Sequence, residues 1–274
     1  MERYGPMFAR LAARGEGAFG AFVTLGDPDL ETSGRILELL AASGADMLEV
    51  GIPFSDPVAD GPVIEASATR ALAAGVRPAN CFALLAEFRS RHPNIPVGIL
   101  TYANLVVARG RDDFYRAAAE AGVDSVLVAD VPVIEAEPFV ETARTHAVAS
   151  VLIAAANTPS ERLRRIAQLG SGYTYCVARS GVTGTRDHVR FDHSAMLETL
   201  AAHDAPPPVF GFGISRPEHA RAALAAGAAG VICGSAIVEM IATEQIDRLP
   251  RFIAEMKAAT RGRAPVPLEA EATA

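Results

Sequence analysis

The sequence predicts a (β/α)8 TIM barrel with an additional N-terminal helix. Eight short runs rich in Val, Ile and Leu alternate with longer helical patterns, and the runs are apolar on both faces. Such runs are typical of strands in a buried parallel sheet, and a barrel of eight of them takes about 250 residues. A weak repeat supports this fold, because ASGADMLEV, EAGVDSVLV and AAGAAGVIC each join a helix end, a small-residue turn and a buried strand.

The element boundaries follow from these patterns. Strands are expected at 19–25, 47–52, 97–102, 125–130, 150–155, 173–178, 208–213 and 230–234, and helices at 31–42, 78–90, 112–121, 160–169 and 217–226. A short helix over 6–13 would cover the bottom of the barrel. We expect one domain over 1–259 and a frayed, Pro- and Ala-rich tail over 260–274. An open doubly wound sheet is the alternative, but the first strand ends in TLGDPD without a GxGxxG turn.

Composition disfavours several classes of protein. The net charge of −7 makes nucleic acid a poor partner. The three cysteines, Cys81, Cys176 and Cys233, lie far apart without CxxC spacing, which argues against a disulfide framework or a structural zinc site. No signal peptide and no run of about 18 apolar residues is evident, so we expect a cytoplasmic protein without a membrane span.

The basic residues narrow the chemistry further. A Schiff-base aldolase needs a lysine on a barrel strand, whereas Lys257 is the only lysine and falls in the last helical region. His188 and His193 flank a loop and are expected to be solvated rather than metal ligands, so no metal site is predicted. Once imine formation and metal chemistry are set aside, acid–base catalysis by carboxylates on a phosphorylated small molecule is the chemistry that the sequence favours.

Two carboxylates are candidates for that chemistry. Glu49 has the opposite parity to the apolar Leu48 and Val50, which directs it toward the barrel mouth. Apolar surroundings would raise its pKa and suit it to proton transfer, although a carboxylate paired with an arginine at the rim is the alternative. Asp60 follows in a loop stiffened by prolines, where it could instead cap the helix that begins near Pro62.

A phosphate site is expected after the last two strands. Gly213 and Gly234 end these strands, and Ser235 could both cap the next helix and bind a phosphate oxygen. Tight turns without a ligand are the alternative. The glycine-rich segment 179–186 has the character of a lid, or of an ordinary crossover.

The motifs LEVGIPFSDPVADGPVI, VTLGDPD, TYANLV, LVADVP, YTYCVARSGVTGT, GFGIS and GSAIV occur in this order. Together they closely resemble the tryptophan synthase alpha chain family, over about residues 3–257. The resemblance implies a TIM barrel that cleaves indole-3-glycerol phosphate into indole and D-glyceraldehyde 3-phosphate in L-tryptophan biosynthesis. The small departures, Val50 and Ser180, touch no catalytic group that the resemblance implies.

The resemblance also implies roles for residues at matching positions. Glu49 would be the acid–base group, Asp60 would hold the indole N–H, and Tyr175 would lie near both. The implied indole pocket consists of Phe22, Leu100 and Ile232; the implied phosphate site consists of Gly184, Gly213, Gly234 and Ser235; and Thr183 would belong to the lid.

A partner is implied in the same way. The family pairs with a pyridoxal-phosphate beta chain in an α2β2 heterotetramer, and no cofactor is expected in this chain. Positions that match the partner interface are Pro53, Asp56, Asn104, Leu105 and Pro132, which could also be ordinary loop packing. Three alternatives stay open: an isomerase of phosphoribosyl intermediates, an activating subunit with little chemistry, and a free-standing indole-releasing lyase.

Overall fold

Parallel strands form the centre of the molecule. The computed structural model describes residues 2–177 and 193–262. The strands of this part are β1 (Ala18–Thr24), β2 (Met47–Gly51), β3 (Val97–Thr101), β4 (Ser125–Val128), β5 (Ala149–Ser150), β6 (Leu152–Ala155), β7 (Thr174–Val177), β8 (Pro208–Gly211) and β9 (Gly230–Cys233). Their order around the sheet is β5-β4-β3-β2-β1-β9-β8-β7-β6, and every pair is parallel.

The predicted strand 150–155 closes the barrel. The structure divides it at Val151 into β5, which pairs with β4, and β6, which pairs with β7. The N–H of Val151 still donates to the carbonyl of Val126 at 3.1 Å, so the chain passes continuously from one edge to the other. Because β5 and β6 are two parts of one continuous strand, the nine assigned strands correspond to the eight strands of the predicted TIM barrel.

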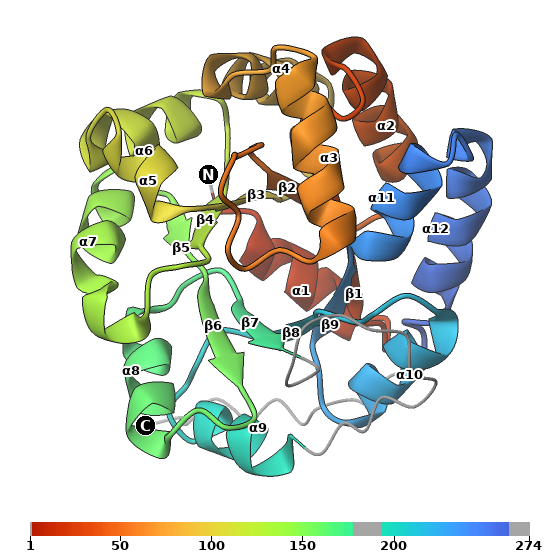
Figure 1. Cartoon of the computed structure of the whole chain (residues 1–274). Helices are drawn as coiled ribbons and strands as arrows, with labels where there is room; N and C mark the ends of the chain where they lie inside the picture. Colours follow the sequence, from red (N-terminus) through yellow and green to blue (C-terminus); the bar gives the residue numbers. More distant parts are fainter. Residues whose placement is uncertain (1, 178–192, 263–274) are drawn as a thin grey trace.

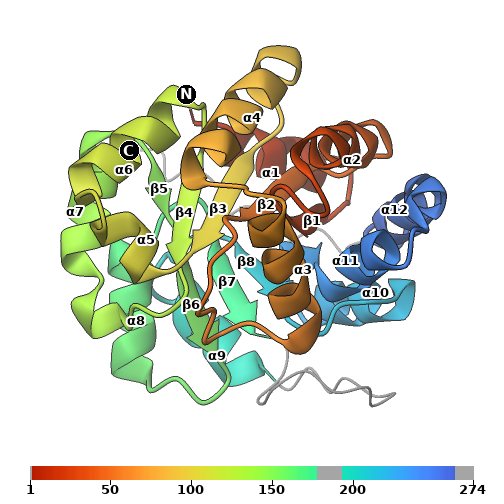
Figure 2. The same ribbon diagram turned by 45° about the horizontal axis from the view of Figure 1, so that its top comes forward.

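Helices surround this barrel (Figures 1 and 2). They are α1 (Tyr4–Ala12), α2 (Leu30–Ala42), α3 (Pro62–Ala73), α4 (Pro78–Arg91), α5 (Ala103–Val107), α6 (Arg111–Glu120), α7 (Glu137–Thr145), α8 (Ser160–Leu169), α9 (Ser194–Ala201), α10 (Pro217–Ala225), α11 (Ser235–Ala242) and α12 (Leu249–Ala258), with short 3-10 turns at Val133–Glu135 and Ile246–Arg248. Among the described helices, none is long and apolar enough to cross a membrane.

Alternation along the strands produces two apolar cores. Leu48 and Val50 of β2 face outward and join the larger core between strands and helices, whereas Met47 faces inward. Helix α1 closes the bottom of the barrel, because its Tyr4 and Leu11 belong to the inner core. The covering N-terminal helix is thus confirmed, although it begins before the predicted position 6.

The C-terminal end of the described chain packs onto the barrel more firmly than predicted. Thr260, assigned to the tail from sequence, is fully buried, and its carbonyl accepts from the N–H of Gly17 at 2.8 Å. Nearby, the Nζ atom of Lys257 lies 2.8 Å from a carboxylate oxygen of Asp46 and 3.0 Å from one of Glu16. The fold therefore includes residues beyond 259; positions 263–274 lie outside the described residues.

A buried carboxylate joins several elements below the barrel. One oxygen of Asp124 lies 2.6 Å from the guanidinium of Arg3, and the other accepts at 2.7 Å from Arg89 and at 2.8 Å from the N–H of Val97. The side chain of Asp124 is only 2% exposed. This single group thus links the N-terminal segment, α4 and the start of β3.

Replacing Asp124 by alanine is expected to destabilise the fold by about 3–5 kcal/mol, because two largely buried guanidinium groups would lose this carboxylate. Denaturant unfolding would measure the loss. Glu137→Gln is the matched control, since its pair with Arg165 at 2.8 Å is half exposed; it should change stability by less than about 1 kcal/mol. Equal effects of the two substitutions would contradict the structural role of Asp124.

Candidate active site

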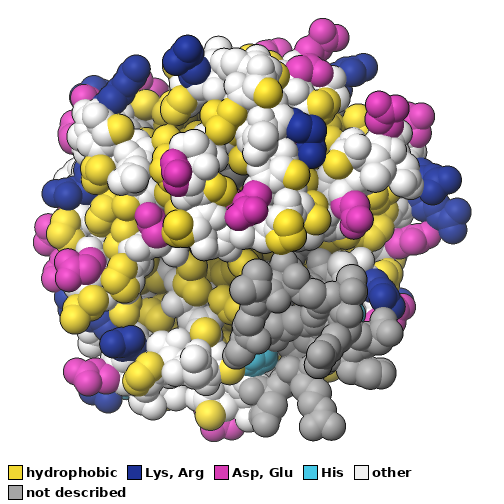
Figure 3. Space-filling view, viewed as in Figure 1, with side chains coloured by type: hydrophobic (Ala, Val, Ile, Leu, Met, Phe, Trp, Pro, Cys, Tyr) yellow, Lys and Arg dark blue, Asp and Glu magenta, His cyan; other side chains and the backbone are white. Residues whose placement is uncertain are grey.

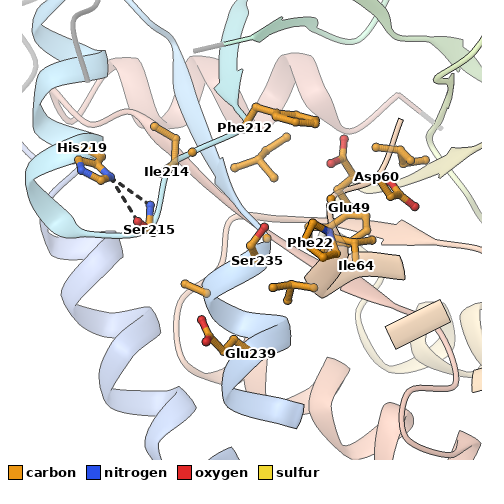
Figure 4. A pocket seen from close by; sticks show the side chains of 18 of the residues that line it. Phe22, Glu49, Asp60, Ile64, Phe212, Ile214, Ser215, His219, Ser235 and Glu239 are labelled. Carbon is orange, nitrogen blue, oxygen red and sulfur yellow. Dashed lines mark hydrogen bonds between the residues drawn. The ribbon is translucent and has the colours of Figure 1, made fainter. Parts of the chain in front are cut away.

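The strands open into a cavity of about 310 Å³, at the lower end of the range of about 300–1,000 Å³ for small-molecule sites. Its walls come from β1, β2, β3, β7 and β9, from the loop before α3, and from the turn that leads to α10. Figure 4 shows Phe22, Glu49 and Asp60 together at one end, with Ser215 and His219 at the other. The cavity thus lies where a TIM barrel carries its catalytic groups.

Glu49 points into the barrel, as its parity predicted. The residue is 2% exposed, and one of its carboxylate oxygens accepts a hydrogen bond of 2.7 Å from the Tyr173 hydroxyl. Burial raises the pKa of Glu49 to about 7, against the opposing effect of the Tyr173 bond. No arginine in the described chain pairs with Glu49, so the alternative of a rim ion pair is wrong. A carboxyl that titrates near neutrality can both donate and accept a proton.

Polar groups from α1, from β4 and from the residue before β7 lie close together below this carboxyl. The ring of Tyr173 lies 5.3 Å from that of Tyr4, whose hydroxyl shares a 2.8 Å hydrogen bond with Ser125. Gly98 is the neighbour of Glu49 on β3, and a Cβ atom there would lie 2.6 Å from the Ser125 hydroxyl oxygen. A glycine is therefore needed for these groups to meet below Glu49.

Sequence reasoning missed Tyr173. The signal was present, because Tyr173 has the same parity as Tyr175 and strands alternate their side chains. Both tyrosines belong to the inner core. Both side chains point into the barrel: Tyr173 lies against the Glu49 carboxyl, and Tyr175 lies in the cavity wall.

Asp60 lies at the same end of the cavity as Glu49 (Figure 4). Partial burial raises its pKa to about 6; Tyr102 opposes part of this rise, and Glu65 adds to it. The Tyr102 hydroxyl is buried near Asp60, but no hydrogen bond with good geometry joins it to any group of the described chain. Helix α3 begins after Gly61 without a side-chain cap, so the alternative role of Asp60 as a helix cap is wrong.

The predicted apolar side chains are brought together around the two carboxyls. Phe22, Leu100, Tyr175 and Ile232 all line the cavity, and Phe22 is the register neighbour of Glu49 on β1. Tyr175 passes so close to β8 that a Cβ atom on Gly211 would lie 2.0 Å from its hydroxyl oxygen. Ile64 and Phe212, which the sequence did not single out, complete this apolar wall.

Residues that follow β8 and β9 form another part of the cavity wall, together with the side chains of His219 and Glu239. Gly213, Gly234 and Ser235 line it, as predicted. Ser235 is the first residue of α11 and makes no side-chain cap, so its expected capping role is wrong. The first N–H groups of a helix have no acceptor within the helix, and here they border the cavity. The predicted Gly184 and the lid residue Thr183 lie outside the described residues.

Several other expectations can be placed. Asp56, Asn104 and Pro132 are exposed and Leu105 is partly exposed, whereas Pro53 is buried beneath its own loop. His193 is 5% exposed and its ring packs on that of Phe210 with 5.0 Å between centroids, so its expected solvation is wrong. His188 lies outside the described residues. Within the described chain, no group of three His, Cys, Asp or Glu side chains could hold a metal ion.

Comparison with known proteins agrees with this geometry. A family model described as tryptophan synthase alpha chain matches residues 8–262. The chain belongs to this family. A tryptophan synthase alpha chain from Yersinia pseudotuberculosis is 52% identical over 267 residues, which cover 95% of this chain and 100% of the relative.

Solved structures of the family share the fold. A tryptophan synthase structure from Mycobacterium tuberculosis has a TM-score of 0.86 at 30% identity, covering 95% of this chain and 98% of the other. A structure described as the tryptophan synthase α2β2 complex from Pyrococcus furiosus has a TM-score of 0.82 at 36% identity, covering 89% and 98%.

The Tyr173→Phe substitution is expected to raise the pKa of Glu49 above about 7, because the hydroxyl that stabilises the ionised carboxylate is removed. NMR titration of side-chain carboxyl carbons in protein labelled with ¹³C-glutamate would measure the shift. Tyr115→Phe is the control, since Tyr115 is equally buried but packs in the outer core. An unchanged Glu49 titration in Tyr173→Phe would contradict this role.

Proposed function

We propose that the cavity cleaves indole-3-glycerol phosphate to indole and D-glyceraldehyde 3-phosphate by a retro-aldol step. Membership of the tryptophan synthase alpha chain family makes the chain a carbon–carbon lyase of L-tryptophan biosynthesis. The observation that carries the mechanism is the pair of carboxyls, Glu49 and Asp60, in a cavity that is also lined by apolar side chains and by the start of helix α11.

Glu49 moves the protons of the reaction. The indole ring must gain a proton at carbon 3, and the adjacent side-chain hydroxyl must lose one as the carbon–carbon bond breaks. A carboxyl with a pKa of about 7 is present in both protonation states near neutral pH, so one group can serve both transfers. The ring itself accepts the electron pair of the breaking bond, and no lysine imine, metal or resident cofactor is required.

Asp60 supplies the counter-charge. Protonation at carbon 3 places positive charge on the ring nitrogen, and an ionised carboxylate beside the N–H stabilises it. With a pKa of about 6, Asp60 is mostly ionised at pH 7 while Glu49 is about half protonated. Two carboxyls whose environments separate their pKa values thus divide the acid–base and the electrostatic roles.

The remainder of the cavity orients the substrate. Phe22, Leu100 and Ile232 form the apolar slot for the indole ring, with Tyr175 beside the carboxyls. The phosphate binds at the opposite end, where Gly213, Gly234 and Ser235 present backbone N–H groups and the hydroxyl of Ser235. Thr183 and Gly184 would complete the lid and the phosphate site.

Loss of either carboxyl should abolish most activity. We expect Glu49→Gln and Asp60→Asn each to raise the barrier to cleavage by about 3–5 kcal/mol, since each removes a group that acts on the reacting ring. Release of indole from indole-3-glycerol phosphate by the purified variants measures the effect. Near-normal turnover in Glu49→Gln would remove the assignment of the acid–base group.

The partner of this lyase is proposed to be a tryptophan synthase beta chain in an α2β2 heterotetramer. The related Pyrococcus furiosus structure is described as such a complex. Exposed apolar side chains on the loops at the mouth of the barrel favour a docking surface: Val58 is 81% exposed and Ile134 is 75% exposed. Figure 3 shows apolar side chains over much of this face, with acidic groups between them. Pyridoxal phosphate would belong to the beta chain.

Substitutions on this face should weaken the complex selectively. Ile134→Asp places a charge on an apolar contact, and we expect at least a tenfold loss of affinity for the beta chain with basal indole release unchanged. Titration of indole release with beta chain measures it. Leu72→Asp is the matched control, because Leu72 is exposed on α3. Asp56→Ala tests the loop before α3; full activation of that variant would remove the loop from the interface.

One experiment separates the remaining functions: indole release by the purified chain with and without excess beta chain. Strong stimulation supports the subunit role, and high activity that ignores the beta chain means a free-standing lyase. No indole under either condition would overturn the proposal and favour the phosphoribosyl isomerase. A cytoplasmic location is also proposed, and it fits three buried, unpaired cysteines.

A further inference from the structure

The turn between β8 and α10 has an unusual backbone. Phe212 and Gly213 have φ angles of 61° and 92°, so two consecutive residues lie in the left-handed region. Glycine adopts this conformation freely, whereas a side chain as large as that of Phe212 does so at a cost. Both residues line the cavity, as do Ile214 and Ser215. A strained turn at a ligand site needs neighbouring groups that hold its shape.

His219 is such a group. Its Nδ1 atom accepts from the backbone N–H of Ser215 at 3.3 Å and lies 3.5 Å from the Ser215 hydroxyl oxygen (Figure 4). Because Nδ1 is the acceptor, the neutral ring carries its proton on Nε2. The imidazole also lines the cavity itself. A side chain in the first turn of α10 is thereby hydrogen-bonded to the strained turn that lines the cavity.

The start of α4 provides a comparison within the same chain. It reads Arg77-Pro78-Ala79-Asn80, and α10 starts with Arg216-Pro217-Glu218-His219. The Asn80 side-chain oxygen accepts from the N–H of Arg77 at 3.0 Å, which is the capping position of α4. His219 instead reaches one residue further back, to Ser215 in the cavity wall. At α4 the third helical residue thus bonds only to the start of its own helix, whereas at α10 it bonds to the turn that lines the cavity before the helix.

We propose that His219 is a positioning residue that holds the Phe212–Ser215 turn so that Gly213 can bind the phosphate group of the substrate. This inference rests on the proposed function for the identity of the phosphorylated ligand. His219 acts through the backbone of Ser215, two residues from Gly213. Its loss should therefore weaken binding of the phosphate portion and leave the carboxyls at the other end of the cavity unaffected.

The test compares His219→Ala with His219→Asn, because asparagine places its Oδ1 atom the same number of bonds from Cα as Nδ1 of histidine. We expect His219→Ala to raise KM for indole-3-glycerol phosphate about tenfold with kcat changed less than twofold, and His219→Asn to restore KM to within about threefold. Calorimetric titration with D-glyceraldehyde 3-phosphate should show the same pattern, whereas titration with indole should not change.

Asn80→Ala controls for a helix start without a cap, since Asn80 does not line the cavity. A purely structural role predicts that His219→Ala and Asn80→Ala both lower the melting temperature and leave KM unchanged, and this result would overturn the inference. A KM raised about tenfold in folded His219→Asn would overturn it too, and that variant is the one to measure if His219→Ala does not fold. Binding of the triose phosphate is measured without turnover, so absence of cleavage would count against the proposed function alone.

Discussion

The carboxyl of Glu49 is buried inside the barrel and yet has to remain ionisable for proton transfer in the proposed reaction, and several neighbouring groups bear on this requirement. Its pKa rises from 4.5 to about 7, which corresponds to about 3 kcal/mol of preference for the neutral form. Because the folded-state pKa is the higher one, this group costs stability progressively as the pH rises from about 4.5 through 7. Burial of apolar side chains in the closed sheet and under the N-terminal helix offsets this loss of stability. The Tyr173 hydroxyl also donates a hydrogen bond to the carboxylate.

The cavity separates two kinds of recognition along its length. At one end, apolar side chains and carboxyls come from β1, β2, β3 and β7 and from the loop before α3. At the other end, turns and helix starts present backbone groups, whose positions depend on local backbone conformation. In the proposed function, the chemistry therefore depends mainly on sheet register, and phosphate binding depends on turn geometry. Substitutions that disturb one end need not disturb the other.

Alternation and strand ends made much of this architecture predictable. The parity of Glu49 relative to Leu48 and Val50 placed it inside the barrel, and all eight strands were located, including the one that Val151 divides. The hydrogen bond from Tyr173 joins residues 124 positions apart, and no local pattern pairs them. The cap considered as an alternative at Asp60 and the cap expected at Ser235 are both absent, because a residue type permits a cap whereas the backbone path into the helix decides whether the side chain can make one.

The segment after the last helix, α12, also shows what the sequence alone could not predict. The Pro- and Ala-rich composition from position 260 onward resembles a tail, yet Thr260 is buried because a backbone hydrogen bond returns the chain to Gly17. Likewise, His193 looked solvated from its loop position but is covered by its packing on Phe210. Burial of single polar residues at element ends depends on tertiary contacts that composition does not encode.

The ion pairs of Lys257 have a practical meaning. Lys257 carries the only lysine amine of the chain, and its side chain is 14% exposed between Glu16 and Asp46. Apart from an N-terminal α-amine, Lys257 is therefore the one amine that acylating reagents can modify, and its reactivity should rise when α12 separates from the barrel. The rate at which Lys257 is acylated would therefore report how often the C-terminal helix opens, and no engineered label is needed for this measurement.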